Sequence, residues 1–245
     1  MDNDALIAGF IVTGTTDKEV LIRGLGPSLA AGGISLSDPL ADPTLELRDQ
    51  TGALIAFSDN WMESPQRQAI IDSMLAPSDD REAAILATLA PGSYTAILRG
   101  ADEGTGLGIV EVYNLDPDLS SNLANISTRG LVNTGDQILI GGFIVDDQNS
   151  IVLLRGLGPS LTAAGVGDAL ANPTLELHDG NGDVIAFNDD WQESDEAIIQ
   201  NTGLAPQFSE ESAILATLGP GAFTAILRGL DDSSGVGLFE VYNLR

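Results

Sequence analysis

Two short stretches combine oxygen-bearing side chains with the only two tryptophans of the chain. IAFSDNW occupies residues 55–61 and IAFNDDW occupies residues 185–191. Calcium binds six to eight oxygen atoms from carboxylates, amides, carbonyls and water, commonly gathered on a loop. Together with a neighbouring hairpin, these stretches predict a Ca2+ site. Its candidate ligands are Asp59, Asn60, Asn188, Asp189, Asp190 and Asp179.

The same stretches also have a purely structural interpretation. Asn and Asp cap turns through side-chain to backbone hydrogen bonds, and a tryptophan fills a large apolar volume. In this interpretation Trp61 and Trp191 plug the ends of their domains. The stretches match neither the EF-hand pattern nor the nonapeptide calcium repeat, and both interpretations stay open at this point.

Arginine is informative because the chain has only 10 Lys and Arg residues against 36 acidic ones. Four arginines and several glutamates recur at matched positions in strand-like runs. A half-buried Arg–carboxylate pair can hold strands in register through bidentate hydrogen bonds, so we predict structural ion pairs. Their members are Arg23, Arg99, Arg155, Arg228, Glu46, Glu111, Glu176 and Glu240. The alternative is a site for an anion or a sugar carboxylate.

Catalytic chemistry finds little support in the composition. The chain has no cysteine and one histidine, His178, which excludes thiol catalysis, disulfides and zinc fingers. His178 is matched by Arg48 in the other half, and nothing nearby suggests a triad. GLGPS (24–28 and 156–160) lacks the lysine of a phosphate loop and predicts a tight turn in which glycine permits a positive φ. We therefore predict that the chain is not an enzyme.

The strongest signal is an internal repeat. Five segments of the first half recur in the second with an offset of about 130 residues. They are ALIAGFIV and ILIGGFIV, VLIRGLGPSL and VLLRGLGPSL, LADPTLEL and LANPTLEL, AILATLAPGSYTAILRG and AILATLGPGAFTAILRG, and GLGIVEVYNL and GVGLFEVYNL. We predict two domains from an internal duplication, residues 1–117 and residues 118–245, each of ordinary domain size.

Short runs rich in Val, Ile, Leu and Thr alternate with turn signals such as DGNGD (179–183), which predicts hairpins. The expected fold is all-β, with two tandem β-sandwich domains of jelly-roll or Ig-like layout; a small barrel is the alternative. A short helix or long loop is expected after Trp191. Expected strands of the second domain lie near 138–145, 151–157, 174–178, 184–188, 212–218, 222–228 and 236–243.

One strand-like segment occurs only once. LANISTRG, within an expected connector strand at 122–130, precedes the second repeat and has no counterpart before the first. Either the sequence given begins after that strand, or the first repeat has an open sheet edge. An open edge is a place for pairing with another chain.

The net charge of −26 argues against binding to nucleic acid, because a polyanion would be repelled. No apolar run approaches the length of a membrane span, so membrane insertion is not expected. The acidic opening, Met1-Asp2-Asn3-Asp4, is no signal peptide and suits a trimmed or mature fragment. Localisation is expected to be extracellular or at the cell surface.

The repeated motifs NISTRG, LIGGFIV, LLRGLGPSL, NPTLELHD, IAFNDDW and GVGLFEVYNL cover nearly the whole chain twice. This series resembles an uncharacterised tandem repeat of large secreted proteins of Verrucomicrobia-like and other environmental bacteria. The order PTLELHDGNGDVIAFNDDW followed by PGAFTAILRG is more loosely similar to pre-peptidase C-terminal and collagen-binding domains. That resemblance implies secreted β-sandwiches, some of which bind calcium through acids near strand ends.

These features predict a non-catalytic structural or adhesive module of a secreted or cell-surface bacterial protein. Self-association or contact with neighbouring repeats, in a fibre or stalk built by strand or edge pairing, is the expected mode of action. The alternative is a calcium-dependent module that binds extracellular carbohydrate or matrix and is attached to an exoenzyme.

Overall fold

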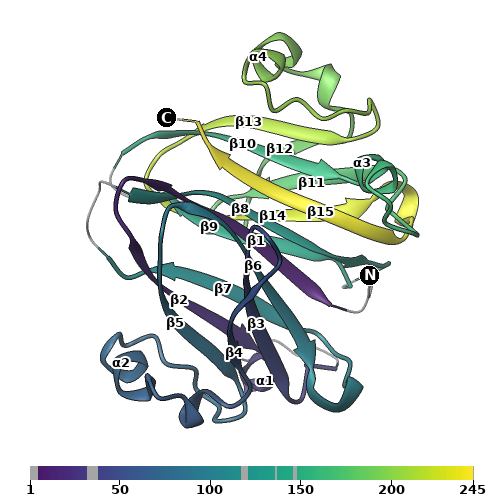
Figure 1. Ribbon diagram of the computed structural model, residues 1–245. Coiled ribbons are helices and arrows are strands. Elements are labelled where there is room, and N and C mark those ends of the chain that lie inside the picture. Colours follow the sequence, from purple (N-terminus) through teal and green to yellow (C-terminus); the bar gives the residue numbers. More distant parts are fainter. Residues whose placement is uncertain (1–4, 32–37, 117–120, 136, 146–147, 245) are drawn as a thin grey trace. The chain divides into compact units, whose positions relative to one another are not determined.

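The computed structural model describes residues 5–31, 38–116, 121–135, 137–145 and 148–244. The fold is all-β, with antiparallel sheets and a few short helices (Figure 1). The chain divides into two compact units, Asp4–Ala124 and Asn125–Arg245, called the first and second unit below. The sequence placed the boundary at 117/118, whereas the observed division falls inside the connector strand, β8 (Ser121–Val132).

The described residues of the first unit form seven strands of its own, β1 to β7. One sheet has the order β4–β3–β6–β1 and the other the order β5–β2–β7. The elements are β1 (Leu6–Gly14), β2 (Lys18–Leu25), α1 (Pro27–Ala31), β3 (Pro43–Asp49), β4 (Leu54–Ser58), η1 (Trp61–Glu63), α2 (Arg67–Asp72), β5 (Ala83–Leu89), β6 (Gly92–Gly100), η2 (Ala101–Glu103) and β7 (Ile109–Asn114).

The second unit repeats this order and adds β8. Its sheets have the orders β12–β11–β14–β9 and β13–β10–β15–β8. After β8, the elements are β9 (Leu139–Val145), β10 (Ser150–Leu157), α3 (Pro159–Ala163), β11 (Pro173–His178), β12 (Val184–Asn188), η3 (Trp191–Glu193), α4 (Glu196–Asn201), β13 (Ser212–Leu218), β14 (Gly221–Gly229), η4 (Leu230–Asp232) and β15 (Gly235–Asn243).

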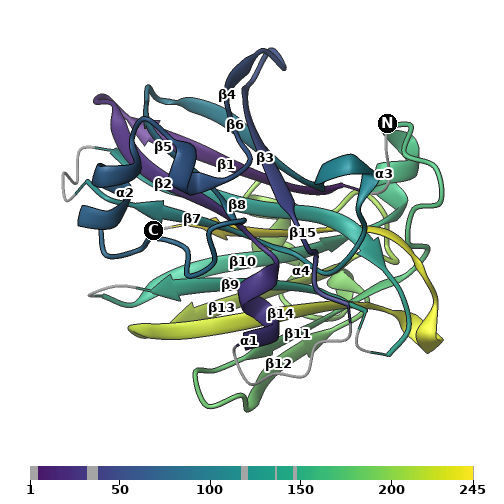
Figure 2. The same cartoon turned by 90° about the horizontal axis from the view of Figure 1, so that it is seen from below.

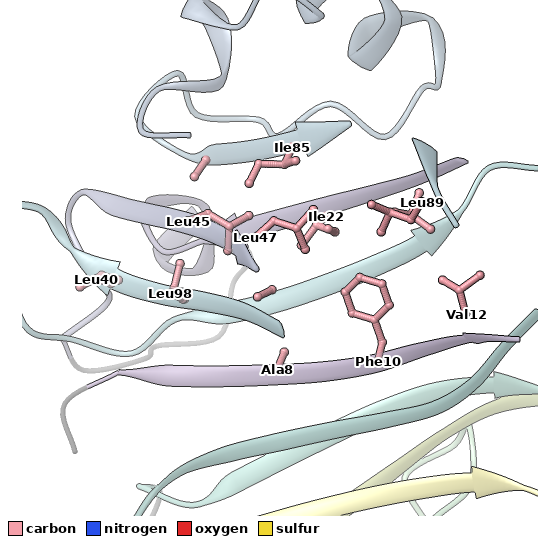
Figure 3. Packing of buried hydrophobic residues seen from close by; sticks show 13 residues of the cluster. Ala8, Phe10, Val12, Ile22, Leu40, Leu45, Leu47, Ile85, Leu89 and Leu98 are labelled. Carbon is pink, nitrogen blue, oxygen red and sulfur yellow. The ribbon is translucent and has the colours of Figure 1, made fainter. Parts of the chain in front are cut away.

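The main core of the first unit lies between its two sheets. Successive side chains of a strand point to opposite faces, so Val20 and Ile22 of β2 face this core together with Leu45 and Leu47 of β3. Figure 3 shows Phe10 pointing from β1 into the same cluster. Apolar residues at every second position of each strand therefore account for the two-sheet packing.

A second, smaller core covers the outer face of the β5–β2–β7 sheet. Leu21 of β2 points to this face and packs with Trp61 and with Ile70 of α2. The helix α2 lies beside β5 (Figures 1 and 2). The second unit builds the same cluster from Leu153, Trp191, Ile199 and Ala213. In each unit, the sheet that carries this smaller core is therefore covered on both faces. The central strand of such a sheet must carry apolar side chains on both of its faces.

The loop GLGPS differs from its expected turn. The glycines of this loop do not have a positive φ; Gly158 has a φ of −143°, and Pro159 begins the short helix α3. Glycine is needed here for space, because a Cβ atom on Gly158 would lie 1.9 Å from the carbonyl oxygen of Leu170, and one on Gly26 would lie 2.1 Å from that of Leu40. No helix among the described residues has the length and hydropathy needed to cross a membrane.

Candidate functional site

The hairpin acid Asp179 is occupied by its own turn. Its Oδ1 accepts hydrogen bonds from the amides of Asn181 and Asp183 at 2.9 and 3.1 Å, and its Oδ2 accepts one from Asn181 Nδ2 at 3.2 Å. These bonds, that of the Asn181 amide first, lower the pKa of Asp179. Asp49 caps the matching turn through the amides of Thr51 and Ala53. Both acids act in the structure as turn caps.

The residue that ends β4 or β12 ties that strand to the next one in the chain. Asn188 Oδ1 accepts the amide of Ala213 at 2.8 Å, and Asn188 Nδ2 donates to the carbonyl of Asp190 at 3.0 Å. In the first unit Ser58 Oγ accepts the amide of Ala84 at 3.1 Å. The side-chain oxygen of Asn188 is therefore directed at the backbone of β13.

The tryptophans are fixed by the loop that follows them. The indole nitrogen of Trp61 donates to the carbonyl of Asp79 at 3.0 Å, and that of Trp191 donates to the carbonyl of Phe208 at 3.0 Å. Both side chains belong to the clusters on the outer face of a sheet. They lie under α2 and α4, whereas the plug interpretation placed them at the ends of the sandwich.

Asp59 has an environment that favours loss of its charge. Its Oδ1 is buried and has no hydrogen-bond partner among the described residues, and the same holds for Oδ1 of Asp42. Burial, and then the negative charges of Asp42, Glu63 and Asp102, raise the pKa of Asp59. A cation beside these oxygens would relieve both the repulsion and the missing bonds.

The other candidate ligands lie beside the short helices that follow them. Asn60, Asp189 and Asp190 are half-buried beside η1 and η3. The backbone carbonyls of Asn60 and Asp190 accept the amides of Glu63 and Glu193, while neither side chain caps its helix. Within the described part of the chain, no three acidic or histidine side chains meet in an arrangement that could hold a metal ion.

Two of the arginines lie in matched polar clusters. Arg23 makes a salt bridge with Glu111, donates to the carbonyl of Leu75 at 2.6 Å, and lies 5.0 Å from the ring centre of Tyr113. Arg155 is bound in the same way by Glu240, the carbonyl of Leu204 and Tyr242. Burial, and next the charge of Glu240, raise the pKa of Tyr242 to about 12. Each cluster joins two strands to the loop that covers their outer face.

The remaining four residues of the expected ion pairs have different partners. Glu46 binds Arg48, two residues along β3, and Glu176 binds His178 in the same way. Arg228 donates to the carbonyl of Gly135 at 3.1 Å. Within the described residues, neither Arg99 nor Arg228 lies at salt-bridge distance from a carboxylate.

His178 and Arg48 perform the same task. Arg48 bridges Glu46 and the carbonyl of Gly52 at 2.8 Å each, while His178 bridges Glu176 at 3.0 Å and the carbonyl of Gly182 at 3.1 Å. The bond to Gly182 is the largest cause of a raised His178 pKa. This histidine is a contact within its own hairpin, as Arg48 is in the first unit.

Glu82 and Glu211 are a further matched pair of acids, for which the sequence favours arginine partners. Their side chains are fully buried and have other partners. Glu211 accepts the amides of Gly158, Ser160 and Phe208 at 3.2, 2.8 and 3.3 Å, and the hydroxyl of Ser160 at 2.7 Å. Glu82 binds Gly26, Ser28 and Asp79 likewise. The glycine-rich loop thus surrounds a carboxylate of the protein itself. The signal in the sequence is the match of two acids directly before the strands β5 and β13.

The described surface includes two open hollows. One, of about 460 Å3, lies over the β11–β12 hairpin and is lined by His178, Asp179 and Ile226 among others; the other, of about 290 Å3, lies beside Glu19, Ser73 and Leu115. Among the described residues that line them there is no Trp, Tyr or Phe. A sugar-binding cleft usually presents such rings.

Comparisons with known proteins add little. No family model and no curated protein matches the chain. Among solved structures, a match is found to the quasi-atomic model of the PBCV-1 virus capsid, with 6% identity and a TM-score of 0.24 over 99% of this chain and 94% of that chain.

Proposed function

We propose that the chain is a non-catalytic structural module of a secreted or cell-surface bacterial protein, built of two tandem β-sandwich domains that arose by duplication. Its action is to form part of a fibre or stalk through contacts between repeats. The repeated sequence segments and the matching strand orders support the duplication.

The observation that carries this proposal is the use of the matched polar residues. The Arg–Glu–Tyr cluster, the buried glutamate with its glycine loop, and the tryptophan with its carbonyl partner recur in both units with equivalent partners. All three lie inside the fold and stabilise it. The polar residues that the two units share therefore serve to hold the β-sandwich structure together. This is expected of an array of structural repeats.

Sedimentation velocity of the chain over a range of concentrations, with electron microscopy of the same samples, tests the proposal. We expect concentration-dependent, elongated assemblies. If the chain stays monomeric at high concentration and binds a soluble polysaccharide or collagen, the result contradicts the proposal.

The second candidate function, a calcium-dependent carbohydrate- or matrix-binding module attached to an exoenzyme, is favoured by one observation. The Oδ1 atoms of Asp42 and Asp59 are buried and have no hydrogen-bond partner among the described residues, and acids surround Asp59. A glycan or collagen binding assay in calcium and in chelator tests this function, and binding in calcium alone would support it.

A further inference from the structure

The last strand of each unit has a different number of neighbours. β15 pairs with β10 on one side and with β8 on the other. β7 has nearly the same sequence, GIVEVYNL against GLFEVYNL, but among the described strands it pairs with β2 alone. The edge that β8 occupies in the second unit therefore has no paired strand in the first, as far as the described residues show; it is called the free edge below.

The free edge leaves the first unit less well covered. In the second unit Phe239 and Val241 face the core and are 1% and 8% exposed, whereas the matching Val110 and Val112 are only half-buried. The side chain of Glu111 is 29% exposed against 11% for Glu240. Coverage by a neighbouring strand accounts for this difference, since the strands are otherwise matched.

β7 carries no protection against strand addition. Soluble proteins usually guard an edge with lysine, proline, a bulge or an inward-pointing charge. The segment Ile109–Asn114 contains no lysine or proline, and its one charged residue, Glu111, is bound to Arg23. Ile109 is 41% exposed. Such an edge offers unpaired backbone groups beside apolar side chains, as in β-strand addition.

The structure also shows which strand fits this edge. β8 runs antiparallel to β15 with Ile126 opposite Val241 and Thr128 opposite Phe239, both on the core face. Asn125 Nδ2 additionally donates to the carbonyl of Val241 at 3.1 Å. The segment 121–132 has one arginine and no acidic residue, so it is attracted to a chain of net charge −26.

We propose that the edge of β7 binds a β8-type strand of another repeat, antiparallel, with the Ile126 position opposite Val112 and the Thr128 position opposite Val110. The strand completes a four-stranded sheet like that of the second unit, and successive repeats are linked by it. This inference rests on the structural function proposed above and names the contact that would build the assembly.

The test uses the whole chain and a synthetic peptide with the sequence of residues 121–132. Hydrogen exchange is followed with the peptide in excess. We expect amide exchange in 109–114 to slow by about tenfold or more, because a paired strand exchanges only when it opens. A peptide with Ile126→Asp, which places a charge on the core face, is expected to give no protection.

Two matched variants locate the contact. Ile109→Lys puts a charge on the free edge, whereas Ile151→Lys puts the same charge on β10, where Ile151 is 45% exposed and both neighbouring strands are present. We expect the first to abolish protection by the peptide and the second to leave it unchanged. The proposal is overturned if the peptide slows amide exchange at another sheet edge or does not slow it in 109–114. It is also overturned if the peptide protects the Ile109→Lys variant as well as the natural protein.

The outcomes separate this inference from the function on which it rests. If the chain forms elongated assemblies but the peptide does not protect β7, the assembly uses another contact and only the inference falls. If the peptide protects β7 but the chain neither assembles nor links with repeats of its kind, the edge is confirmed and the fibre function falls.

Discussion

At the scale of single residues, the buried glutamates predict a loss of stability when they are made neutral. Glu211→Gln replaces an oxygen that accepts several N–H and O–H groups with an amide that donates, so buried donors lose their partner. We expect a loss of unfolding free energy of about 2–3 kcal/mol, measured by chemical denaturation. The exposed neighbour provides the control, because Glu210→Gln removes the same charge without burial. Equal stability of the two variants would contradict the assigned role.

The arginine clusters predict an asymmetry between the units. Arg155→Ala leaves Glu240 without its partner in a buried place, which costs about 3–5 kcal/mol when a buried pair is broken. Arg23→Ala should cost less, because water reaches Glu111 more easily. Hydrogen exchange of β10 and β2 measures each effect in its own unit. A larger loss from Arg23→Ala would show that the difference in exposure does not control the cost.

His178 predicts that the stability of the second unit depends on pH. Since Arg48 takes its place in the first unit, substitutions can remove this dependence from one unit and introduce it into the other. Its pKa is raised above the ordinary value of 6.5, so the bridge contributes stability that is fully present below that value and is lost as pH rises through the folded-state pKa. His178→Arg keeps the charge at all pH values. We expect it to match the natural protein at about pH 5.5 and to exceed it by less than about 1 kcal/mol at about pH 8.5.

The reciprocal variant checks this result. Arg48→His should introduce the same loss of stability at alkaline pH into the first unit, because Glu46 and the carbonyl of Gly52 offer equivalent partners. Melting curves of both variants at the two pH values suffice. If the pH dependence of the melting temperature is unchanged in either variant, the bridge made by residue 178 or 48 is not its cause.

At the scale of elements, the glycine loop before each short helix predicts a steric effect. Gly158→Ala forces a methyl group into the carbonyl of Leu170, and we expect a loss on the order of 2–4 kcal/mol. Gly167 lies in the same connection, with open space around it and no positive φ. Gly167→Ala should be neutral or slightly stabilising. Thermal melts of the two variants measure the contrast.

The same loop shows what the sequence could and could not predict. Alternating apolar residues and hairpin signals such as DGNGD predict the all-β class and most strands, because these features are local. The reason for glycine at 158 lies twelve residues away at Leu170, and no local pattern records that approach. The partners of Glu211 are backbone amides, which have no sequence signature. The tryptophans predict large buried side chains, but the sequence does not show which face of the sheet these side chains cover.

At the scale of the whole molecule, the charge of −26 predicts a response to salt that can be separated from metal binding. Sodium chloride should raise the melting temperature because it screens repulsion among the acids. Calcium chloride at the same ionic strength gives a further rise only if the ion binds the folded state at a site. Asp59 is the residue at which we test for such a site, because its buried Oδ1 has no hydrogen-bond partner among the described residues.

Asp59→Asn distinguishes the two effects. In chelator the variant should melt higher than the natural protein, by a few degrees or less, because a carboxyl whose pKa is raised by burial destabilises the fold once it is ionised. If calcium binds there, the variant should lose the additional calcium shift, whereas Asp80→Asn, an exposed acid on the same unit, should keep it. A calcium shift that survives in Asp59→Asn would place the ion elsewhere. No shift beyond that of sodium would leave Asp59 as an acid whose charge is disfavoured by burial and by the neighbouring acids, with no metal ion to compensate.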